Sequence, residues 1–327
     1  MALNLKNLII QNPYYKSATA MKLCDYATGI PLEEMYTYYA DLARGQIGII
    51  ALDHMYVERR GHAGHSQVGI DSDDKIKYHE RLVKCIKAVD PKTQVFCQLA
   101  HAGQHSQEEN KLDYNTCSAE TLYDIIKAFG DAAMRAKAAG YDGVQIHGAH
   151  TYLVSQSISD AYNKRTDEFN PQDFKFLRLV LENVRKAGIV SGIKIQTNDW
   201  IDGCGVNPEF AVKIISSLDF DFVEVSGGGW GKENKLATIR PVQDKFYYKE
   251  AVELLNKEKH MESQFIIATG GFDTKEDAKE AFDLGCKMVG FARKFIRNPT
   301  FLIKDDKECD KCNKCLRNEF SYCVIKD

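Results

Sequence analysis

The chain has 327 residues, of which 44% are hydrophobic and 27% are charged, and its 43 basic and 46 acidic side chains give a net charge of -3. No segment concentrates the basic residues, which argues against a nucleic-acid partner. No apolar run approaches the roughly 18 residues of a membrane span, and the first apolar run is too short for a signal peptide. We therefore expect a cytoplasmic protein that does not contact a membrane.

Short apolar runs alternate with longer segments of helical period along the chain. The runs that predict strands lie near Tyr15–Ala20, Ile47–Leu52, Val95–Leu99, Gly143–His147, Gly192–Gln196, Phe220–Val225, Gln264–Ala268 and Met288–Phe291. The predicted helices are Glu33–Arg44, Asp74–Val89, Ala119–Ala139, Asp173–Ala187, Pro208–Leu218, Asp244–Lys259 and Thr274–Leu284. Strands that are apolar throughout are typical of a parallel sheet covered by helices. The pattern predicts an α/β fold, a (β/α)8 TIM barrel over residues 1–303, followed by a short cysteine-rich tail over residues 304–327.

Polar and glycine residues follow the predicted strands, where a barrel of this type builds its active site. One group fits a phosphate site. Thr269, Gly270 and Gly271 follow the seventh strand, and Gly290 and Arg293 lie at the eighth. Glycines permit close approach of the backbone to an anion, and an arginine supplies charge-assisted hydrogen bonds. A tight turn without a ligand is the alternative, and the pattern does not say whether the phosphate belongs to a substrate or a cofactor.

A second group leaves the fourth strand as His147, His150 and Tyr152. The two imidazoles could form a metal pair, but no nearby carboxylates have a recognised ligand spacing. They could instead donate hydrogen bonds to one oxygen that becomes negative during a reaction, with the Tyr152 phenol as proton donor. Unrelated loop histidines and a core tyrosine remain the alternative. Lys194, inside an apolar strand, is either solvated at the barrel end or buried against a ligand that gains negative charge.

Four cysteines crowd the tail, at positions 309, 312, 315 and 323. Cys309, Cys312, Cys315 and Cys323 could hold zinc or an iron–sulfur cluster such as [4Fe–4S]. Their spacing matches neither of the common ferredoxin patterns, and free thiols are the alternative reading. The other six cysteines are scattered, which is typical of free thiols in a reducing compartment.

These residues together resemble the Old Yellow Enzyme family of NADH:flavin oxidoreductases, which includes the enoate reductases and the 2,4-dienoyl-CoA reductase-like barrel domain. The resemblance covers nearly the whole chain. It is densest in Gln98–Gly103, Tyr141–Leu153, Asn163–Glu168, Ala268–Gly271 and Phe291–Pro299. The block around His147 and His150, together with Asn163–Glu168, is the specific part.

The resemblance implies a role for each matching residue. Ser17, Ala18 and Thr19 would line FMN, with Thr19 near the C4 carbonyl. Gln98 would contact the pyrimidine edge, Lys194 would stand near N1, and Gly228 would be a further cofactor contact. Gly270, Gly271, Ala292 and Arg293 would hold the phosphate. His147 and His150 would grip the carbonyl oxygen of an unsaturated substrate, while Tyr152 protonates Cα and flavin N5 delivers hydride to Cβ. Asp53 departs from the family's small residue and would place a carboxylate near the flavin edge.

The implied function is reduction of activated C=C bonds in enones, or of quinones or nitro compounds, with NADH or NADPH as electron donor. No G-x-G-x-x-G fingerprint occurs in the chain, so NAD(P)H would enter the same pocket as the substrate. Two alternatives stay open at this point. One is an FMN barrel fed electrons by a partner through a tail-bound cluster, and the other is a non-catalytic flavin-binding barrel. Barrel oxidoreductases of this type often pair, so a homo-oligomer is one option, and the sequence leaves the oligomeric state open.

Overall fold

The computed structural model describes residues 2–64, 66–229, 246–258, 264–304, 309–317 and 319–325. Eight parallel strands close into a barrel in the order β10-β3-β4-β5-β6-β7-β8-β9, which confirms the predicted (β/α)8 fold. The barrel strands are β3 (Tyr14–Lys16), β4 (Ile49–Tyr56), β5 (Gln94–Ala100), β6 (Gly143–Gly148), β7 (Val190–Gln196), β8 (Val223–Ser226), β9 (Ile266–Thr269) and β10 (Met288–Phe291).

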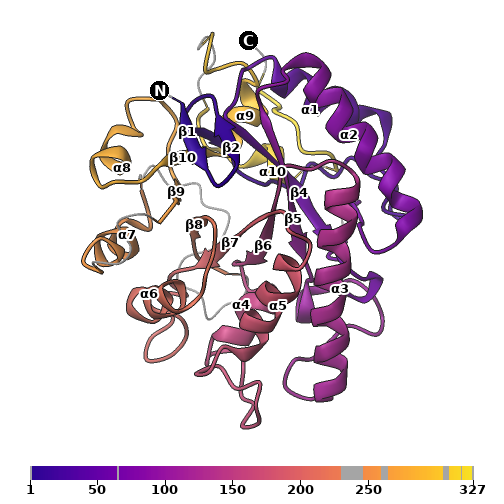
Figure 1. Ribbon diagram of the computed structural model, residues 1–327, viewed down its shortest axis with the longest axis vertical. Coiled ribbons are helices and arrows are strands. Elements are labelled where there is room, and N and C mark those ends of the chain that lie inside the picture. The colour runs from indigo at the N-terminus through magenta and orange to yellow at the C-terminus, as the bar shows by residue number, and fades with distance from the viewer. Residues whose placement is uncertain are drawn as a thin grey trace.

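Helices surround the strands as an outer ring that follows the chain from indigo to orange (Figure 1). They are α1 (Glu33–Ala43), α2 (Ile76–Val89), α3 (Ala119–Ala138), α4 (Leu153–Ile158), α5 (Lys175–Arg185), α6 (Pro208–Ser217), α7 (Lys249–Leu255), α8 (Lys279–Asp283), α9 (Arg293–Arg297) and α10 (Lys314–Arg317). Short 3₁₀ turns occupy Arg59–Gly61, Asp73–Lys75 and Gly103–His105. Local sequence sets several helix starts. The Ser118 side chain accepts a hydrogen bond from the backbone N–H of Thr121 at 3.1 Å, and Asn207 caps α6 in the same way.

A hairpin that the strand pattern did not predict closes one end of the barrel. Its strands β1 (Leu3–Leu5) and β2 (Leu8–Ile10) pair antiparallel. Leu5 and Ile10 belong to one buried apolar cluster with inward side chains of the barrel, including Phe96 and Phe222. This packing fills the N-terminal end of the barrel with apolar side chains, so a ligand site can open only at the other end.

Inside the barrel the side chains become polar toward the C-terminal ends of the strands. Alternate residues of a strand point to the same face, so positions two apart can be compared. The inward positions change from Phe96 to Gln98, from Phe222 to Glu224, from Ile267 to Thr269 and from Met288 to Gly290. The N-terminal end of the barrel is therefore filled by packed apolar side chains, and the C-terminal end presents hydrogen-bonding groups.

Several predicted boundaries were wrong. Strand β4 runs to Tyr56, beyond the predicted end at Leu52, and its pairing with β5 shifts register between Ala51 and His54. Such a bulge re-aims neighbouring side chains, and Asp53 and His54 both line the cavity described below. Helix α8 begins at Lys279, because residues 275–278 form turns. The ends of the predicted helix Asp244–Lys259 lie outside the described residues.

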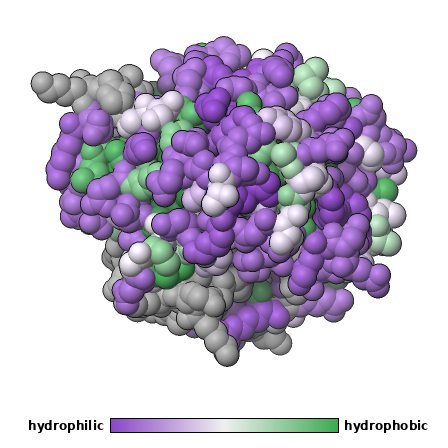
Figure 2. Space-filling view, turned by 90° about the horizontal axis from the view of Figure 1, so that it is seen from below, coloured by the Kyte–Doolittle hydropathy of each residue, from purple (hydrophilic) through white to green (hydrophobic). Residues whose placement is uncertain are grey.

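Within the described part of the chain, no helix is long and apolar enough to span a lipid bilayer. The face seen in Figure 2 is mostly hydrophilic, with apolar residues scattered among polar ones. Homo-oligomerisation therefore stays a prediction from the sequence, with no contiguous apolar area on the coloured residues of this face to support it.

Phe301 anchors the segment that follows α9, and we predict that Phe301→Ala lowers the free energy of unfolding by about 3–5 kcal/mol. Its side chain is fully buried, and its ring centroid lies 5.0 Å from that of Phe291 and 4.7 Å from that of Phe295. Urea unfolding measures the change. Phe320 is 37% exposed, so Phe320→Ala serves as a control and should cost about 1 kcal/mol or less. Equal losses in the two variants would contradict the packing role of Phe301.

Candidate functional site

A cavity of about 600 Å³ opens at the C-terminal end of the barrel. Nearly every site residue predicted from the sequence contributes to its wall. These are Ser17, Ala18, Thr19, Asp53, Gln98, His147, His150, Tyr152, Lys194, Gly270, Gly271, Ala292 and Arg293. His147 and Arg293 therefore share one cavity, as a site for a single mononucleotide requires.

Gly228 is the exception among the predicted catalytic and cofactor-binding residues. It does not line the cavity, since its N–H donates to the carbonyl of Asn198 at 3.1 Å and its carbonyl accepts from Gln196 at 3.1 Å. A cofactor contact at Gly228 stays a prediction that this geometry does not support. The backbone φ of Gly228 is 78°, in the left-handed region, which explains why this position is a glycine.

The two histidines and the tyrosine form a compact group on the cavity wall. The His147 ring centroid lies 5.2 Å from that of His150 and 4.8 Å from that of Tyr152. His150 and Thr151 adopt positive φ angles of 63° and 57° in the turn that leaves β6. Non-glycine residues adopt this conformation at a cost of about 1–2 kcal/mol each. A strained turn at this place is typical of a functional site.

Hydrogen bonds fix the orientation of His150. Its Nε2 lies 2.9 Å from the Ser226 hydroxyl, and its backbone N–H donates to the side chain of Gln196 at 2.9 Å. The Nδ1 atom of His147 is buried and has no hydrogen-bond partner among the described residues. An orphaned polar atom in a buried site points to a ligand, because leaving it unpaired costs free energy.

Burial sets the protonation states of this group. Desolvation, reinforced by the positive charges of His150, His54 and Lys194, lowers the pKa of His147 well below its usual value. Burial raises the pKa of Tyr152 to about 12. At neutral pH the imidazole is therefore uncharged and the phenol keeps its proton, so both can act as hydrogen-bond donors.

Two further histidines join the group without having been assigned a role from the sequence. The His54 ring lies 5.5 Å from Tyr152 and 6.0 Å from His147, and His105 lies 6.4 Å from Tyr152. Gln67 fixes the His54 tautomer. Its Oε1 accepts from the Ala63 N–H at 2.7 Å, so its amide nitrogen, 2.8 Å from His54 Nδ1, donates to that atom. In the sequence, only its position next to the predicted residue Asp53 indicated that His54 could belong to the site.

A buried ion pair lies at the floor of the cavity. Lys194 Nζ is 3.1 Å from Glu224 Oε1 and 2.9 Å from the Ser17 hydroxyl. Gln145 donates to the second oxygen of Glu224 at 2.8 Å and accepts from Gln98 at 2.7 Å. Burial tends to raise the pKa of Glu224, but Lys194 and these hydrogen bonds outweigh it and lower the pKa overall. The carboxylate is therefore ionised, and it compensates the charge of Lys194.

Glu224 and Gln145 were not among the site residues predicted from the sequence, although the strand pattern indicates both. Lys194 pairs with Glu224 across β7 and β8, and Gln145 precedes His147 by two residues on the same strand face. Because side chains on one face of a strand are two positions apart, Gln145 shares the face of His147. The pairing of β7 with β8 then places Glu224 beside Lys194.

Asp53 lines the cavity as predicted, but its carboxylate is held by the protein. It accepts hydrogen bonds from the Met21 N–H at 2.5 Å and from the Tyr39 hydroxyl. Burial raises the pKa of Asp53, and Lys16 acts in the opposite direction. Lys16 is itself fully buried, and desolvation lowers its pKa to about 8 despite the attraction of Asp53.

The predicted phosphate residues meet at the opposite part of the same cavity. Gly270 and Gly271 have φ angles of 131° and 82°, which only glycine adopts readily, and a Cβ on Gly270 would lie 2.8 Å from the Tyr247 ring. Arg293 and Lys294 add positive charge to this wall. The donor set matches a phosphate, because it combines exposed backbone with guanidinium and ammonium groups.

These features fit FMN. The cavity has a size typical of cofactor sites. It offers an anion-binding end at Arg293, a buried cation at Lys194, and an unpaired imidazole atom at His147. The amide of Gln98 supplies polar contacts of the kind that a pyrimidine edge needs.

The tail folds back over this end of the barrel. Ser321 donates from its backbone and its hydroxyl to the carbonyls of Met21 and Ala20, and Lys22 donates to the carbonyl of Leu316 at 3.0 Å. Cys309, Lys311, Leu316 and Ser321 line the main cavity. The boundary at residue 303 stays a prediction, and the described part of the tail is packed on the barrel.

The four tail cysteines converge on a second cavity of about 10 Å³. That volume holds about one water molecule, so this arrangement does not fit a four-iron cluster. Within the described ranges, no group of three or more Cys, His, Asp or Glu residues is arranged to hold a metal ion. The four predicted metal ligands Cys309, Cys312, Cys315 and Cys323 therefore line one small cavity, but within the described residues they are not arranged to hold a metal ion.

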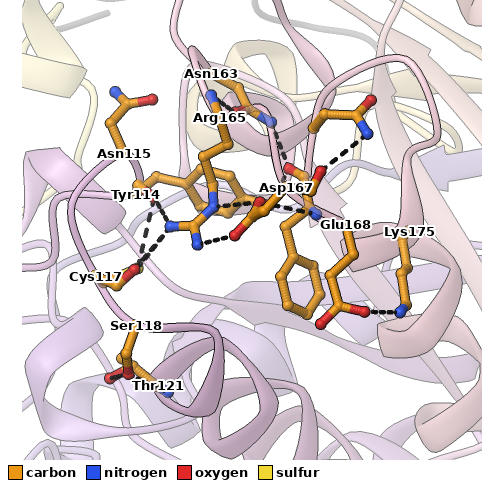
Figure 3. Close-up of polar contacts among 12 residues, drawn as sticks. Tyr114, Asn115, Cys117, Ser118, Thr121, Asn163, Arg165, Asp167, Glu168 and Lys175 are labelled. Carbon is orange, nitrogen blue, oxygen red and sulfur yellow. Dashed lines mark hydrogen bonds and ion pairs between the residues drawn. The ribbon is translucent and has the colours of Figure 1, made fainter.

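The specific sequence Asn163–Glu168 supports the site from outside it (Figure 3). Arg165 donates to the carbonyls of Tyr114 and Cys117 at 2.8 and 2.7 Å and forms an ion pair with Asp167. Asn163 donates a hydrogen bond at 2.7 Å to the carbonyl of Ser157, the penultimate residue of α4. Because α4 begins directly after Tyr152, these bonds position the segment that carries the phenol.

Comparison with known proteins places the chain among flavin enzymes. A sequence model of the NADH:flavin oxidoreductase / NADH oxidase family matches residues 2–311. An NADH:acrylate oxidoreductase of Vibrio harveyi is 28% identical over 315 residues, covering 85% of this chain but only 30% of that protein. An NADPH dehydrogenase of Bacillus cytotoxicus is 27% identical over 323 residues, covering 91% of this chain and 88% of that protein.

Solved structures share the fold at lower sequence identity. A 2-naphthoyl-CoA reductase in complex with 2-naphthoyl-CoA superposes with a TM-score of 0.86 and 19% identity, covering 96% of this chain and 54% of that chain. An old yellow enzyme homologue from Zymomonas mobilis gives a TM-score of 0.75 and 21% identity, covering 94% and 93%. The chain thus spans about half of the first structure and nearly all of the second.

The ion pair under the cavity predicts an acid-sensitive stability. We expect Glu224→Gln to lower the free energy of unfolding at pH 7 by about 3 kcal/mol, because Lys194 loses its buried counter-charge. Folding favours the ionised Glu224, whose pKa is lowered. Its contribution is therefore complete above the usual glutamate pKa of about 4.3 and is lost as the pH falls through the folded-state value.

Urea unfolding of both proteins at pH 7, 5 and 3.5 measures this effect. The difference between wild type and variant should shrink toward the lowest pH. Glu253 is a surface residue whose partner is Lys249, so Glu253→Gln is the control and should change little. A stability difference that is independent of pH would refute the role of the carboxylate charge.

Proposed function

Because the chain belongs to the NADH:flavin oxidoreductase / NADH oxidase family, and is thus an FMN-dependent oxidoreductase that uses NADH or NADPH, we propose that it reduces activated C=C bonds. The resemblance to Old Yellow Enzymes noted in the sequence is confirmed at the level of family and fold. The choice of reaction rests on one observation: His147, His150 and Tyr152 form one group on the wall of the cavity that also contains the anion-binding end at Arg293.

In this proposal the residues of the cavity would hold FMN, which would supply the hydride chemistry between NAD(P)H and Cβ of the alkene. His147 and His150 donate hydrogen bonds to the substrate carbonyl oxygen and stabilise the negative charge that develops there, by about 3 kcal/mol per donor. The neutral imidazole of His147 suits this role, since it donates without carrying a fixed charge. Tyr152 gives its proton to Cα and regains one from solvent, so that the alkene gains one hydride and one proton in each turnover.

Lys194 and Arg293 bind the cofactor in the proposal. The Lys194 ammonium, held by Ser17 and Glu224, favours a flavin ring that becomes more negative on reduction. Arg293, Gly270, Gly271 and Ala292 hold the phosphate, while Ser17, Ala18, Thr19 and Gln98 contact the ring. NAD(P)H and the alkene use the same face of the cavity in alternation.

The class of alkene is supported by a relative. The Vibrio protein is described as an NADH:acrylate oxidoreductase, and acrylate is an alkene activated by a neighbouring carboxylate. We include enones, quinones and nitro compounds as substrates on the same chemical ground. No step of the reaction is routed through the tail cysteines, because their arrangement does not fit a cluster. The presence of all three of His147, His150 and Tyr152 disfavours a non-catalytic flavin-binding barrel.

The two histidines are tested together. The variant His147→Ala/His150→Ala should keep its flavin, as judged by visible absorbance, and should reduce cyclohexenone at least about 100-fold more slowly, because two donors to the carbonyl oxygen are lost. Ferricyanide, which has no carbonyl oxygen to hold, serves as the matched acceptor and should be reduced at the wild-type rate. Undiminished enone turnover would exclude these residues from the mechanism.

Tyr152 is tested separately as the proton donor. Tyr152→Phe should slow enone reduction by about 100-fold or more, with NADPH-dependent ferricyanide reduction unchanged. Because the pKa of Tyr152 is about 12, the phenol stays protonated up to pH 10, and the ratio of wild-type to variant rates should be constant from pH 7 to 10. A ratio that collapses near neutral pH would assign the proton transfer to another group. Tyr123→Phe, a change on the exposed face of α3, is the control.

A further inference from the structure

The side chain of Lys311, in the cysteine-rich tail, reaches into the phosphate end of the cavity. It is 6% exposed, its Nζ donates to the carbonyl of Gly271 at 2.9 Å, and it shares the cavity wall with Arg293. Gly271 is one of the two glycines whose backbone forms the anion-binding turn after β9. A residue from outside the barrel is thus fastened to the turn at which the phosphate is expected.

The burial of this ammonium group calls for an anion. An ammonium has three N–H donors, and among the described residues only the Gly271 carbonyl accepts from Lys311. No carboxylate in the described ranges lies within the 4.0 Å ion-pair distance of Lys311. A buried cation without a counter-charge is costly, so a ligand anion at this place would offset that cost.

The surrounding charges are predominantly positive. Arg293, Lys294 and Lys311 all act electrostatically on Asp273, the carboxyl group on this wall. Desolvation nevertheless raises the pKa of Asp273, Asp277 adds to this rise, and the three cations only partly oppose it. A phosphate monoester carries nearly two negative charges at neutral pH and offers three acceptor oxygens, which suits this group of cations better than the single carboxyl does.

A second tail residue positions the arginine. Asn313 Oδ1 accepts a hydrogen bond from Arg293 Nη1 at 2.6 Å, and the Asn313 side chain is almost completely buried. The tail therefore contacts the phosphate end at two points. Asn313 orients the guanidinium of Arg293, and Lys311 adds an ammonium group beside Gly271.

We propose that Lys311 is a ligand of the FMN phosphate and that the tail is a part of the cofactor site. The proposal rests on the phosphate-binding role of Arg293 and the two glycines given above. It assigns to the tail a function that does not depend on whether its cysteines bind a metal.

The test compares FMN with riboflavin, which has the same ring and no phosphate. Full-length protein depleted of flavin is titrated with each flavin, and binding is followed by the quenching of flavin fluorescence. Lys311→Met keeps the length and the packing of the side chain but removes its charge. We expect this variant to bind FMN about 10-fold or more weakly, the effect of one lost charge-assisted hydrogen bond, and to bind riboflavin within about twofold of wild type. Lys311→Arg should retain most of the preference for FMN.

Two further variants calibrate the result. Lys314 lies on the same tail but is exposed and does not line the cavity, so Lys314→Met should leave both affinities unchanged. Arg293→Ala should release FMN and abolish the preference over riboflavin. Unchanged FMN affinity in Lys311→Met, or equal losses for both flavins, would overturn the assignment of Lys311.

Other outcomes locate a failure elsewhere. If wild type shows no preference for FMN over riboflavin, the whole proposed phosphate end fails, and Lys311 with it. If Lys311→Met keeps its FMN affinity but raises KM for NADPH and not for NADH, Lys311 contacts the extra phosphate of that dinucleotide, and the FMN assignment is wrong.

Discussion

The closing of eight parallel strands into one barrel is the constraint on which the site depends. Each strand delivers its last inward side chain to the same end of the molecule, so residues that are far apart in the sequence meet around one cavity. His147 from β6, Lys194 from β7 and Gly290 from β10 line the same cavity only for this reason. The hairpin β1–β2 and the inward apolar side chains seal the opposite end.

Burial then gives these side chains their chemical properties. The same desolvation that lowers the pKa of His147 raises the pKa of Tyr152, and both shifts favour the uncharged form. In the same interior, Glu224 and Ser17 hold the ammonium group of Lys194 at 3.1 and 2.9 Å. One cavity therefore combines the neutral side chains of His147 and Tyr152 with the ion pair of Lys194 and Glu224.

The tail extends this arrangement beyond the barrel. Its described residues pack on the β3–α1 loop and on α9, and Met21, Ile296 and Cys315 form a small apolar cluster between them. Lys311 and Asn313 contact the anion-binding end through this packing. The same contacts thus hold the tail against the barrel and against one wall of the cavity.

The sequence by itself determined the barrel and predicted that His147, His150, Tyr152, Lys194 and Arg293 lie at one rim of it, because strand alternation and short motifs are local signals. Only the tertiary structure decided the partners of these residues. Glu224 compensates Lys194 across neighbouring strands, and Lys311 meets Gly271 across 40 positions. The structure also shows Gly228 turned to its backbone partners and not to the cavity. Pairing of this kind depends on strand register and chain packing, which a pattern read along one segment does not contain.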